Sequence, residues 1–475
     1  MDSHELHWLG IYELSRRIGT GELSPLDVVD ALIERIEALN PKILGFIEVT
    51  AEAARVEAIK AEEEIAAGRK KGPLHGIPYG VKDIIDTAGV RTTRGSSVFM
   101  NRVPDEDAGC IDRLREAGAI LIGKCLTQEF ASGPLSHNPH FGTARNPWDL
   151  SRITGGSSTG SAASVSAGLC PAALGTDTGG SIRAPSALCG IVGLKPTNGR
   201  VSLLGVCPNS MSYDQAGPMV RSARDAALFL QGMVGYEPRD PYSREVPISD
   251  FSERLNRGVR GMRVGLCPGL TNHAEVDAEV QQAFERAVEV FRSFGAEVKT
   301  LEFTEGDRFA SIHQAVIGAE FIEFHRPIFE KYSDSYADYT RMRIEECMKH
   351  ADLDRYIRAQ REREVLSRNV LKLFHEVDVI LTPALPCIAP KADNLKATIN
   401  GKEVDYSLDQ TMPFLTPQNM TGCPSLVVPM GFSAKDGMSV SLQIIGRRWE
   451  EAEVLRAGHA YEEATPEIRA RRPVL

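Results

Sequence analysis

The chain has 475 residues, of which 42% are hydrophobic, and a formal net charge of −10 from 54 basic and 64 acidic residues. This size suffices for a large buried core, and the acidic balance gives no electrostatic reason to expect nucleic acid or an anionic membrane as partner. No uncharged apolar run approaches the ~20 residues that span a bilayer. The beginning lacks the features of a signal peptide, and the nine cysteines have no CxxC spacing, so we expect free thiols and a cytoplasmic location.

The first 70 residues are predicted to be a helical lead-in packed on the main domain. Ser24-Pro25 is a helix start, because serine is a good N-cap and proline suits the first helical position. Apolar residues then recur at helical spacing from Leu26 to Ile36. Residues 51–69 are rich in Ala and Glu and predict a second helix. The remainder, 71–475, is predicted to be one compact domain.

Beyond residue 70 the pattern favours an α/β fold. Ile77, Tyr79 and Val81 alternate with smaller or polar residues, which indicates a strand. A helix over 107–117 is followed by the short apolar strand 119–123, an order typical of α/β proteins. The alternation continues downstream, with strand candidates at 261–266, 295–298 and 377–382 and long charged helices over 307–376.

Three segments carry candidate chemistry, and the richest in glycine runs from Gly175 to Arg183. Ser181 follows two glycines there, so the backbone can turn sharply and consecutive N–H groups can point at one spot, as an oxyanion hole requires. Taken alone, such a sequence is more often an ordinary turn, since glycine and serine both dominate turns.

The second segment, Gly155 to Ser161, permits two other interpretations. Its two outer glycines have the spacing of a phosphate-binding loop, but Ser161 stands where the lysine belongs, which excludes that loop. The segment also fits a G-x-S-x-G nucleophile elbow with Ser158 at its centre. An elbow should follow a strand, and 146–152 reads as a poor strand, so this interpretation is disfavoured.

The third segment, Gly80 to Asp83, places Lys82 beside an apparently buried strand. Most lysines are solvated, but burial lowers the pKa of a lysine and lets the neutral amine act as a base. Metal sites are not predicted. His4 and His7 are one residue short of an HExxH spacing, and His137 and His140 have no evident third ligand.

Together and in this order, the three segments resemble the amidase signature family. The similarity extends to Asn146-Pro147-Trp148-Asp149, Gly193-Leu194-Lys195-Pro196-Thr197, Gly21 to Pro25, Leu74 to Pro78, Gly422 to Pro429 and Leu442 to Gly446. It spans nearly the whole chain, with 235–375 as the most variable part. The resemblance implies an α/β/α sandwich whose central mixed β-sheet is surrounded by helices, and it implies no cofactor.

The resemblance also implies a Ser–cis-Ser–Lys triad that hydrolyses a carbon–nitrogen amide bond through an acyl-serine. By motif position Ser181 is the nucleophile, Ser157 the bridging serine on a cis peptide after Gly156, and Lys82 the base. The oxyanion donors are then the backbone N–H groups of Thr178, Gly179 and Gly180. Ser158, Asp177 and Arg183 are supporting candidates, and for the last two a structural ion pair is an equal alternative.

Three departures leave the substrate open. Thr159 replaces a glycine of many members, and Ser439 and Ser441 replace a proline and a glycine. The middle of the chain also lacks the tyrosine- and glycine-rich stretch of the glutamine-using component of glutamyl-tRNA amidotransferases. We therefore expect a stand-alone amidase acting on a small-molecule amide, without nucleic acid or membrane, with a homodimer left open. The alternatives are such a glutaminase component of an amidotransferase and a catalytically dead binding paralogue. We expect residues 125–137 and parts of 310–350 to line the acyl pocket.

Overall fold

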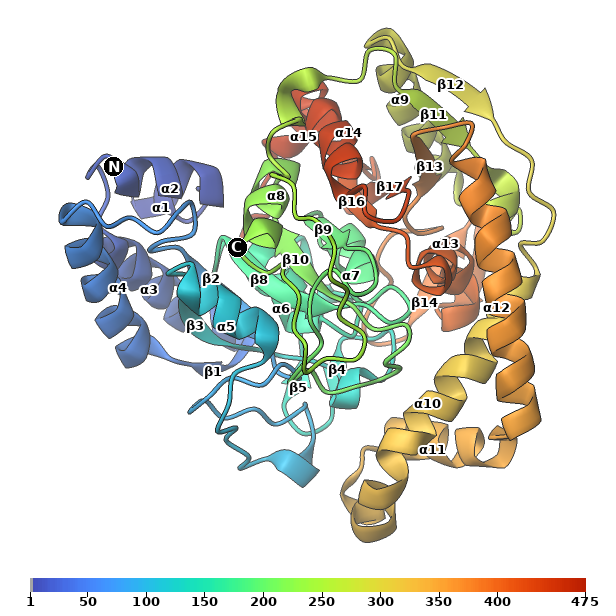
Figure 1. Cartoon of the computed structure of the whole chain (residues 1–475), viewed down its shortest axis with the longest axis horizontal. Helices are drawn as coiled ribbons and strands as arrows, with labels where there is room; N and C mark the ends of the chain where they lie inside the picture. The colour runs from blue at the N-terminus through green and yellow to red at the C-terminus, as the bar shows by residue number, and fades with distance from the viewer. Residues whose placement is uncertain (1–2) are drawn as a thin grey trace.

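The centre of the molecule is an eleven-stranded mixed β-sheet, seen in a computed structural model that describes residues 3–475 (Figure 1). In spatial order the strands are β1 (Phe46–Val49), β3 (Ile120–Cys125), β2 (Pro78–Lys82), β8 (Ala172–Thr176), β10 (Ala216–Val220), β9 (Val192–Lys195), β16 (Ser425–Phe432), β17 (Ser439–Gly446), β13 (Val379–Pro383), β11 (Arg263–Leu266) and β12 (Glu297–Thr300). Strand β2 is parallel to both β3 and β8, and β11 is parallel to β12 and β13. Every other neighbouring pair in this sheet is antiparallel.

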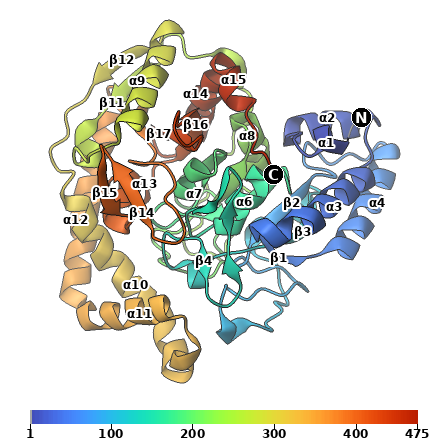
Figure 2. The same cartoon turned by 180° about the vertical axis from the view of Figure 1, so that it is seen from behind.

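Helices cover both faces of this sheet (Figures 1 and 2). They are α1 (Ser3–Leu6), α2 (Ile11–Gly19), α3 (Pro25–Ile43), α4 (Ala51–Ala66), α5 (Gly109–Glu116), α6 (Thr159–Ser166), α7 (Arg183–Leu188), α8 (Ala223–Gln231), α9 (Ala278–Ser293), α10 (Arg308–Tyr332), α11 (Asp338–His350), α12 (Leu353–Leu373), α13 (Leu408–Thr421), α14 (Glu451–Ala464) and α15 (Pro466–Arg469). Short two-stranded ladders lie outside the sheet: β4 (His137–Asn138) with β5 (Gly142–Thr143), β6 (Arg145–Asn146) with β7 (Asp149–Ile153), and β14 (Lys396–Ile399) with β15 (Lys402–Asp405). The predicted sandwich is thus confirmed.

Side chains alternate between the two faces of each strand, so the apolar core forms separate clusters on the two faces of the sheet. In β2, Tyr79 and Val81 belong to the largest cluster, which includes residues of α5, α8 and α14. The opposite face packs against α3, α4 and α6, with Ile122 of β3 and Ala173 of β8 in a second cluster. Because successive side chains of a strand point to opposite faces, Lys82 does not share the face of Tyr79 and Val81.

The N-terminal lead-in is mostly helical, but it also contributes a strand. Helix α3 begins as expected, with the Ser24 side chain accepting a hydrogen bond from the Leu26 N–H at 3.1 Å. Between α3 and α4, however, β1 pairs antiparallel with β3 and forms one edge of the sheet. A four-residue strand between two helices carries too little periodicity to stand out in the sequence.

The long charged segment 307–376 forms three helices, α10, α11 and α12, as predicted. Figure 1 shows α10 and α11 at the periphery, away from α3 and α4. Helix α10 packs against α11, α12 and α13. No helix in the described part of the chain is long and apolar enough to cross a membrane.

Candidate active site

The site begins at the carboxyl ends of two neighbouring parallel strands. Lys82 is the last residue of β2, and Thr176 is the last residue of β8. The Lys82 Nζ donates hydrogen bonds to Ser157 Oγ at 2.7 Å and to Thr176 Oγ1 at 2.8 Å. The structure therefore brings together the lysine and the serine that the sequence places 75 positions apart.

The environment of Lys82 favours the neutral amine. The side chain is fully buried, and burial lowers its pKa to about 7, although the negative charges of Asp214 and Asp177 act in the opposite direction. Desolvation penalises the ammonium form because the interior solvates charge poorly. Near neutral pH, this amine can therefore accept a proton from a hydroxyl.

Ser157 lies in a tight loop between β7 and α6. The peptide bond between Gly156 and Ser157 is cis, and Ser157 is fully buried. A side chain at position 156 would meet the Leu135 carbonyl oxygen at 2.4 Å, so only glycine fits there. The Ser157 carbonyl oxygen accepts from the Gln128 N–H at 3.2 Å, which anchors the loop against the neighbouring segment.

Ser158 has a different role from its neighbour. It is fully buried, and its hydroxyl contacts the Thr176 backbone, donating to the carbonyl oxygen at 3.3 Å and accepting from the N–H at 3.3 Å. One expectation about this region was wrong. Residues 149–153 form strand β7, pairing with β6 outside the central sheet, so a strand does precede the loop. The hydroxyl of Ser158 is nevertheless committed to backbone groups.

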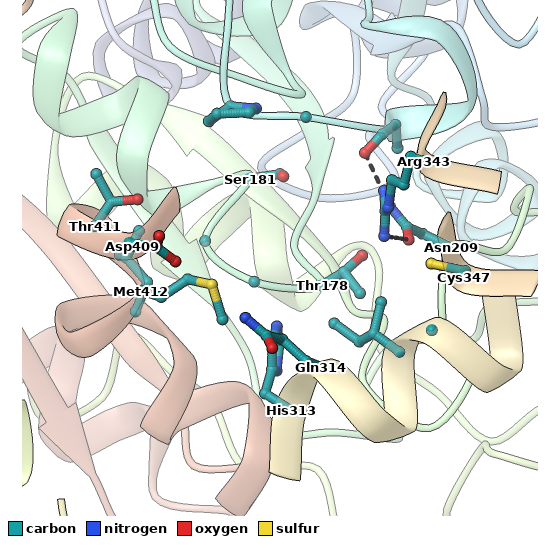
Figure 3. Close-up of a pocket in the computed structure, with 18 of the residues that line it drawn as sticks. Thr178, Ser181, Asn209, His313, Gln314, Arg343, Cys347, Asp409, Thr411 and Met412 are labelled. Carbon is teal, nitrogen blue, oxygen red and sulfur yellow. Dashed lines mark hydrogen bonds between the residues drawn. The ribbon is translucent and has the colours of Figure 1, made fainter. Parts of the chain in front are cut away.

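Ser181 borders a cavity of about 570 Å³ that Thr178 also lines (Figure 3). Unlike Ser157, it is partly exposed. The preceding Gly180 has a φ of 114°, a conformation that favours glycine, and a Cβ there would meet Leu415 Cδ1 at 2.4 Å. These two constraints explain why glycine precedes the serine.

The backbone before Ser181 offers two free donors to this cavity. The Gly180 N–H donates to Asp177 Oδ1 at 2.8 Å. The N–H groups of Thr178 and Gly179 have no hydrogen-bond partner in the part of the chain that the structure describes. Of the three expected oxyanion donors, Thr178 and Gly179 are therefore the two whose N–H is not already engaged.

Asp177 and Arg183 form a fully buried ion pair beneath this turn. The Arg183 Nε and Nη2 donate to the two Asp177 carboxylate oxygens at 3.0 Å each. Burial alone would raise the pKa of Asp177, but the charge of Arg183 outweighs it and holds that pKa well below its usual range. The remaining Arg183 donors contact Gln418, Gln443, Leu415 and Asn419. The pair fixes the turn to α13 and β17.

Residues from three parts of the chain line the cavity: 131–134, helices α10 and α11, and helix α13. Ala131, Gly133 and Pro134 line it, as do residues of α10 and α11 such as His313 and Arg343, in agreement with the ranges expected from the sequence. Figure 3 also shows Asp409, Thr411 and Met412 of α13 facing it. This last wall was not foreseen.

Comparison with known proteins identifies the family. Residues 27–455 match the Amidase family model. The chain belongs to the amidase family.

Relatives and solved structures agree with this assignment. The amidase is 39% identical over 484 residues to the A subunit of the glutamyl-tRNA(Gln) amidotransferase of Roseiflexus sp. (strain RS-1), covering 97% of each chain. It is similar to a structure of an inhibitor-bound vestigial complex that bears on the origins of an s-triazine catabolic enzyme, with a TM-score of 0.91 and 31% identity over 98% of this chain and 100% of that one. It also resembles the peptide amidase of Stenotrophomonas maltophilia, with a TM-score of 0.84 and 31% identity over 98% of both chains. The protein is therefore an enzyme that hydrolyses amide carbon–nitrogen bonds.

Several polar residues of the amidase site gave no recognisable signal in the sequence. Arg343 lies in a helix whose charges look solvated, yet it lines the cavity and donates to Ser132 Oγ at 2.9 Å and Asn209 Oδ1 at 3.1 Å. His313 is buried in the same wall, and burial lowers its pKa to about 3, so the ring is neutral. Only the tertiary fold brings these side chains to the cavity.

The nine cysteines of the amidase are free thiols. Among the described residues, no three His, Cys, Asp or Glu side chains are grouped so that they could hold a metal ion. His137 instead contacts the Thr143 hydroxyl at 2.8 Å, and His140 contacts Glu129 Oε1 at 2.9 Å. Both histidines thus have ordinary structural partners.

Proposed function

We propose that the enzyme cleaves its amide through an acyl-Ser181 intermediate, with Lys82 as base and Ser157 as the relay between them. The observation that carries this proposal is the 2.7 Å hydrogen bond from Lys82 Nζ to Ser157 Oγ. Burial adds to it by lowering the pKa of Lys82 to about 7. A serine hydroxyl needs a partner to take its proton, and the Ser157 hydroxyl can donate one proton while it accepts another.

The proton path follows from this arrangement. Neutral Lys82 takes the Ser157 proton as Ser157 takes the proton of Ser181, whose oxygen attacks the substrate carbonyl carbon. The free N–H groups of Thr178 and Gly179 stabilise the negative oxygen that develops. The relay then returns the proton to the leaving amine, and the carbon–nitrogen bond breaks. Water, activated by the same relay, hydrolyses the acyl-serine and regenerates the hydroxyl.

One cation of the cavity wall, Arg343, points to the kind of amide that is bound, although the carboxylates of Glu346 and Asp409 line the cavity as well. Arg343 lines the cavity, and no carboxylate of the described residues lies within ion-pair distance of its guanidinium. Its partners include two neutral oxygens, the Cys347 side chain and the ring of Phe321, 4.0 Å from the guanidinium carbon. A guanidinium matches the geometry of a carboxylate. We therefore propose a small amide that carries a carboxylate.

A panel of matched substrates tests the proposal. The purified chain is assayed with monoamides of short dicarboxylic acids and with uncharged alkyl amides of the same length. We expect the chain alone to hydrolyse the monoamides, with a kcat/KM at least tenfold higher than for the alkyl amides. Equal turnover of both sets would remove the role of Arg343 in recognition, and no turnover of either would favour a binding paralogue.

The alternative is a glutaminase component that works in a complex. It is favoured by the 39% identity to a component of an amidotransferase over 97% of both chains and by the fold shared with a chain of a protein complex. The absent tyrosine- and glycine-rich stretch argues for the stand-alone enzyme. Glutamine is therefore included in the panel, with and without a partner protein from such a complex. Glutamine turnover that appears only with the partner would establish the alternative.

A further inference from the structure

Asp214 is a buried carboxylate whose contacts all lie around the cavity. One oxygen, Oδ1, accepts a hydrogen bond from the Thr178 hydroxyl. The other, Oδ2, accepts from the backbone N–H groups of Asn209 at 2.9 Å and Ser210 at 3.0 Å. The side chain of Asp214 is only 4% exposed, so water contributes little to its solvation.

Asp214 differs from Asp177, the other buried aspartate of the site. Asp177 is paired with Arg183, whereas no lysine or arginine of the described residues forms an ion pair with Asp214. Burial consequently raises the pKa of Asp214 to about 7, against the hydrogen bonds of Thr178, Asn209 and Ser210. A buried carboxylate without a cation is unfavourable. The Asp214 side chain is instead engaged in hydrogen bonds with Thr178, Asn209 and Ser210.

Two of the three residues that donate hydrogen bonds to the Asp214 side chain line the cavity. Thr178 is the first residue of the turn that carries the two free N–H groups, and it lines the cavity. Asn209 lines the facing wall, donates to the Ala131 carbonyl oxygen at 2.9 Å and accepts from Arg343 Nη2. Asp214 therefore connects the turn before Ser181 to the wall that holds Arg343.

We propose that Asp214 is a positioning residue that acts through the Thr178 hydroxyl to fix the Thr178 and Gly179 N–H groups where the oxyanion forms. The inference rests on the proposed acyl-Ser181 mechanism. An oxyanion hole stabilises the transition state only if its donors are held in place before the charge develops. The free N–H groups have no hydrogen bond of their own to hold them. The Asp177–Arg183 pair holds the turn from Gly180 onward, and the Thr178 hydroxyl is a contact that holds its first residue.

The experiment compares Thr178→Val with Thr178→Ser, a matched pair that removes or keeps the hydroxyl. The valine variant should lose about 10- to 100-fold in kcat, the scale of a misplaced catalytic group, with KM within about threefold of wild type. The serine variant should retain at least ten times the kcat of the valine variant, because it still donates to Asp214.

Asp214→Asn completes a double-mutant cycle. The asparagine can accept fewer of the three donors, so kcat should fall. The double variant with Thr178→Val should lose no more kcat than the worse of the two single variants, because both substitutions disrupt the same hydrogen bond between Thr178 and Asp214. Equal kcat for the valine and serine variants, or effects that multiply in the double variant, would overturn the proposal. Should Asp214→Asn fail to fold, the Thr178 pair decides alone.

A fluorophosphonate label separates this proposal from the mechanism on which it rests. Wild type and the Thr178 variants should all be labelled stoichiometrically at Ser181, which shows an intact nucleophile and fold. Labelling of wild type at another residue would refute the acyl-Ser181 mechanism itself. Labelling at Ser181 with an unchanged kcat in Thr178→Val would refute only the role of Asp214.

Discussion

The segment 155–183 and the helices α10–α12 both border the cavity, but they are built differently. Most of the segment is buried, and several of its charged and hydroxyl side chains are hydrogen-bonded to one another or to the backbone. The helices instead expose large apolar side chains, with Met342 68% and Leu353 70% accessible, and many charges. The contrast fits our proposal that the buried segment performs the chemistry while the helices select the substrate.

Within the buried segment, we expect the largest loss of activity when the proposed nucleophile, Ser181, is replaced. Ser181→Ala should lower kcat by on the order of 10⁶-fold, as removal of a serine nucleophile does elsewhere, while the thermal unfolding midpoint stays close to that of wild type. Ser158→Ala, the matched neighbour, should retain a fluorophosphonate label at Ser181. Label found on Ser158 in wild type would instead assign the chemistry to the elbow-like serine.

Replacement of Lys82 should cause the next largest loss of kcat. Lys82→Ala should lower kcat by roughly 10²- to 10⁴-fold, the contribution of a general base, and Lys82→Arg should not rescue it because the guanidinium stays protonated. Since the pKa of Lys82 is lowered to about 7, the neutral base is present above that pH. The wild-type kcat/KM should therefore rise with pH through about 7. Near-normal turnover of Lys82→Arg would rule out this role.

The ion pairs of the two regions should differ in their effect on stability. Arg183→Met removes one partner of a fully buried pair and should lower the free energy of unfolding by about 3–5 kcal/mol, because Asp177 is left buried and unpaired. Arg368→Met on α12 breaks an exposed pair with Glu364 and should cost less than ~1 kcal/mol. Urea denaturation of both variants measures the difference. Equal losses would show that burial does not distinguish the two pairs.

The smallest expected effect comes from a substitution that tests whether the helices α10–α12 select the substrate. Arg343→Gln should raise KM for a carboxylate-bearing amide by roughly 10- to 100-fold, the value of a hydrogen bond to a charged group, and leave KM for an uncharged amide within about threefold. Gln314→Ala, on the same wall, is the matched control and should change neither. A fall in kcat for both amides would mean that Arg343 supports the chemistry itself.

The same contrast explains what the sequence could predict. The resemblance to the amidase signature family singles out Ser157, Ser181 and Lys82 as the proposed triad, and the structure places Lys82 at the end of a strand. The long charged helices at 307–376 were also predicted. The inward direction of Arg343 was not, since its neighbours look like a solvated helix face. Asp214 likewise lies in no periodic pattern, and β1 is too short to be recognised.

The partners of Arg183 have a consequence for the order in which the enzyme is made. Two of its contacts are with Gln418 and Gln443, which lie 235 and 260 positions later in the chain. When a ribosome has released only the serine- and glycine-rich half, Lys82, Ser157 and Ser181 are present, but Gln418 and Gln443, which accept hydrogen bonds from this arginine, are not. The turn that carries Ser181 can settle only when nearly the whole polypeptide has emerged. Chains truncated before Gln443 are thus expected to be inactive.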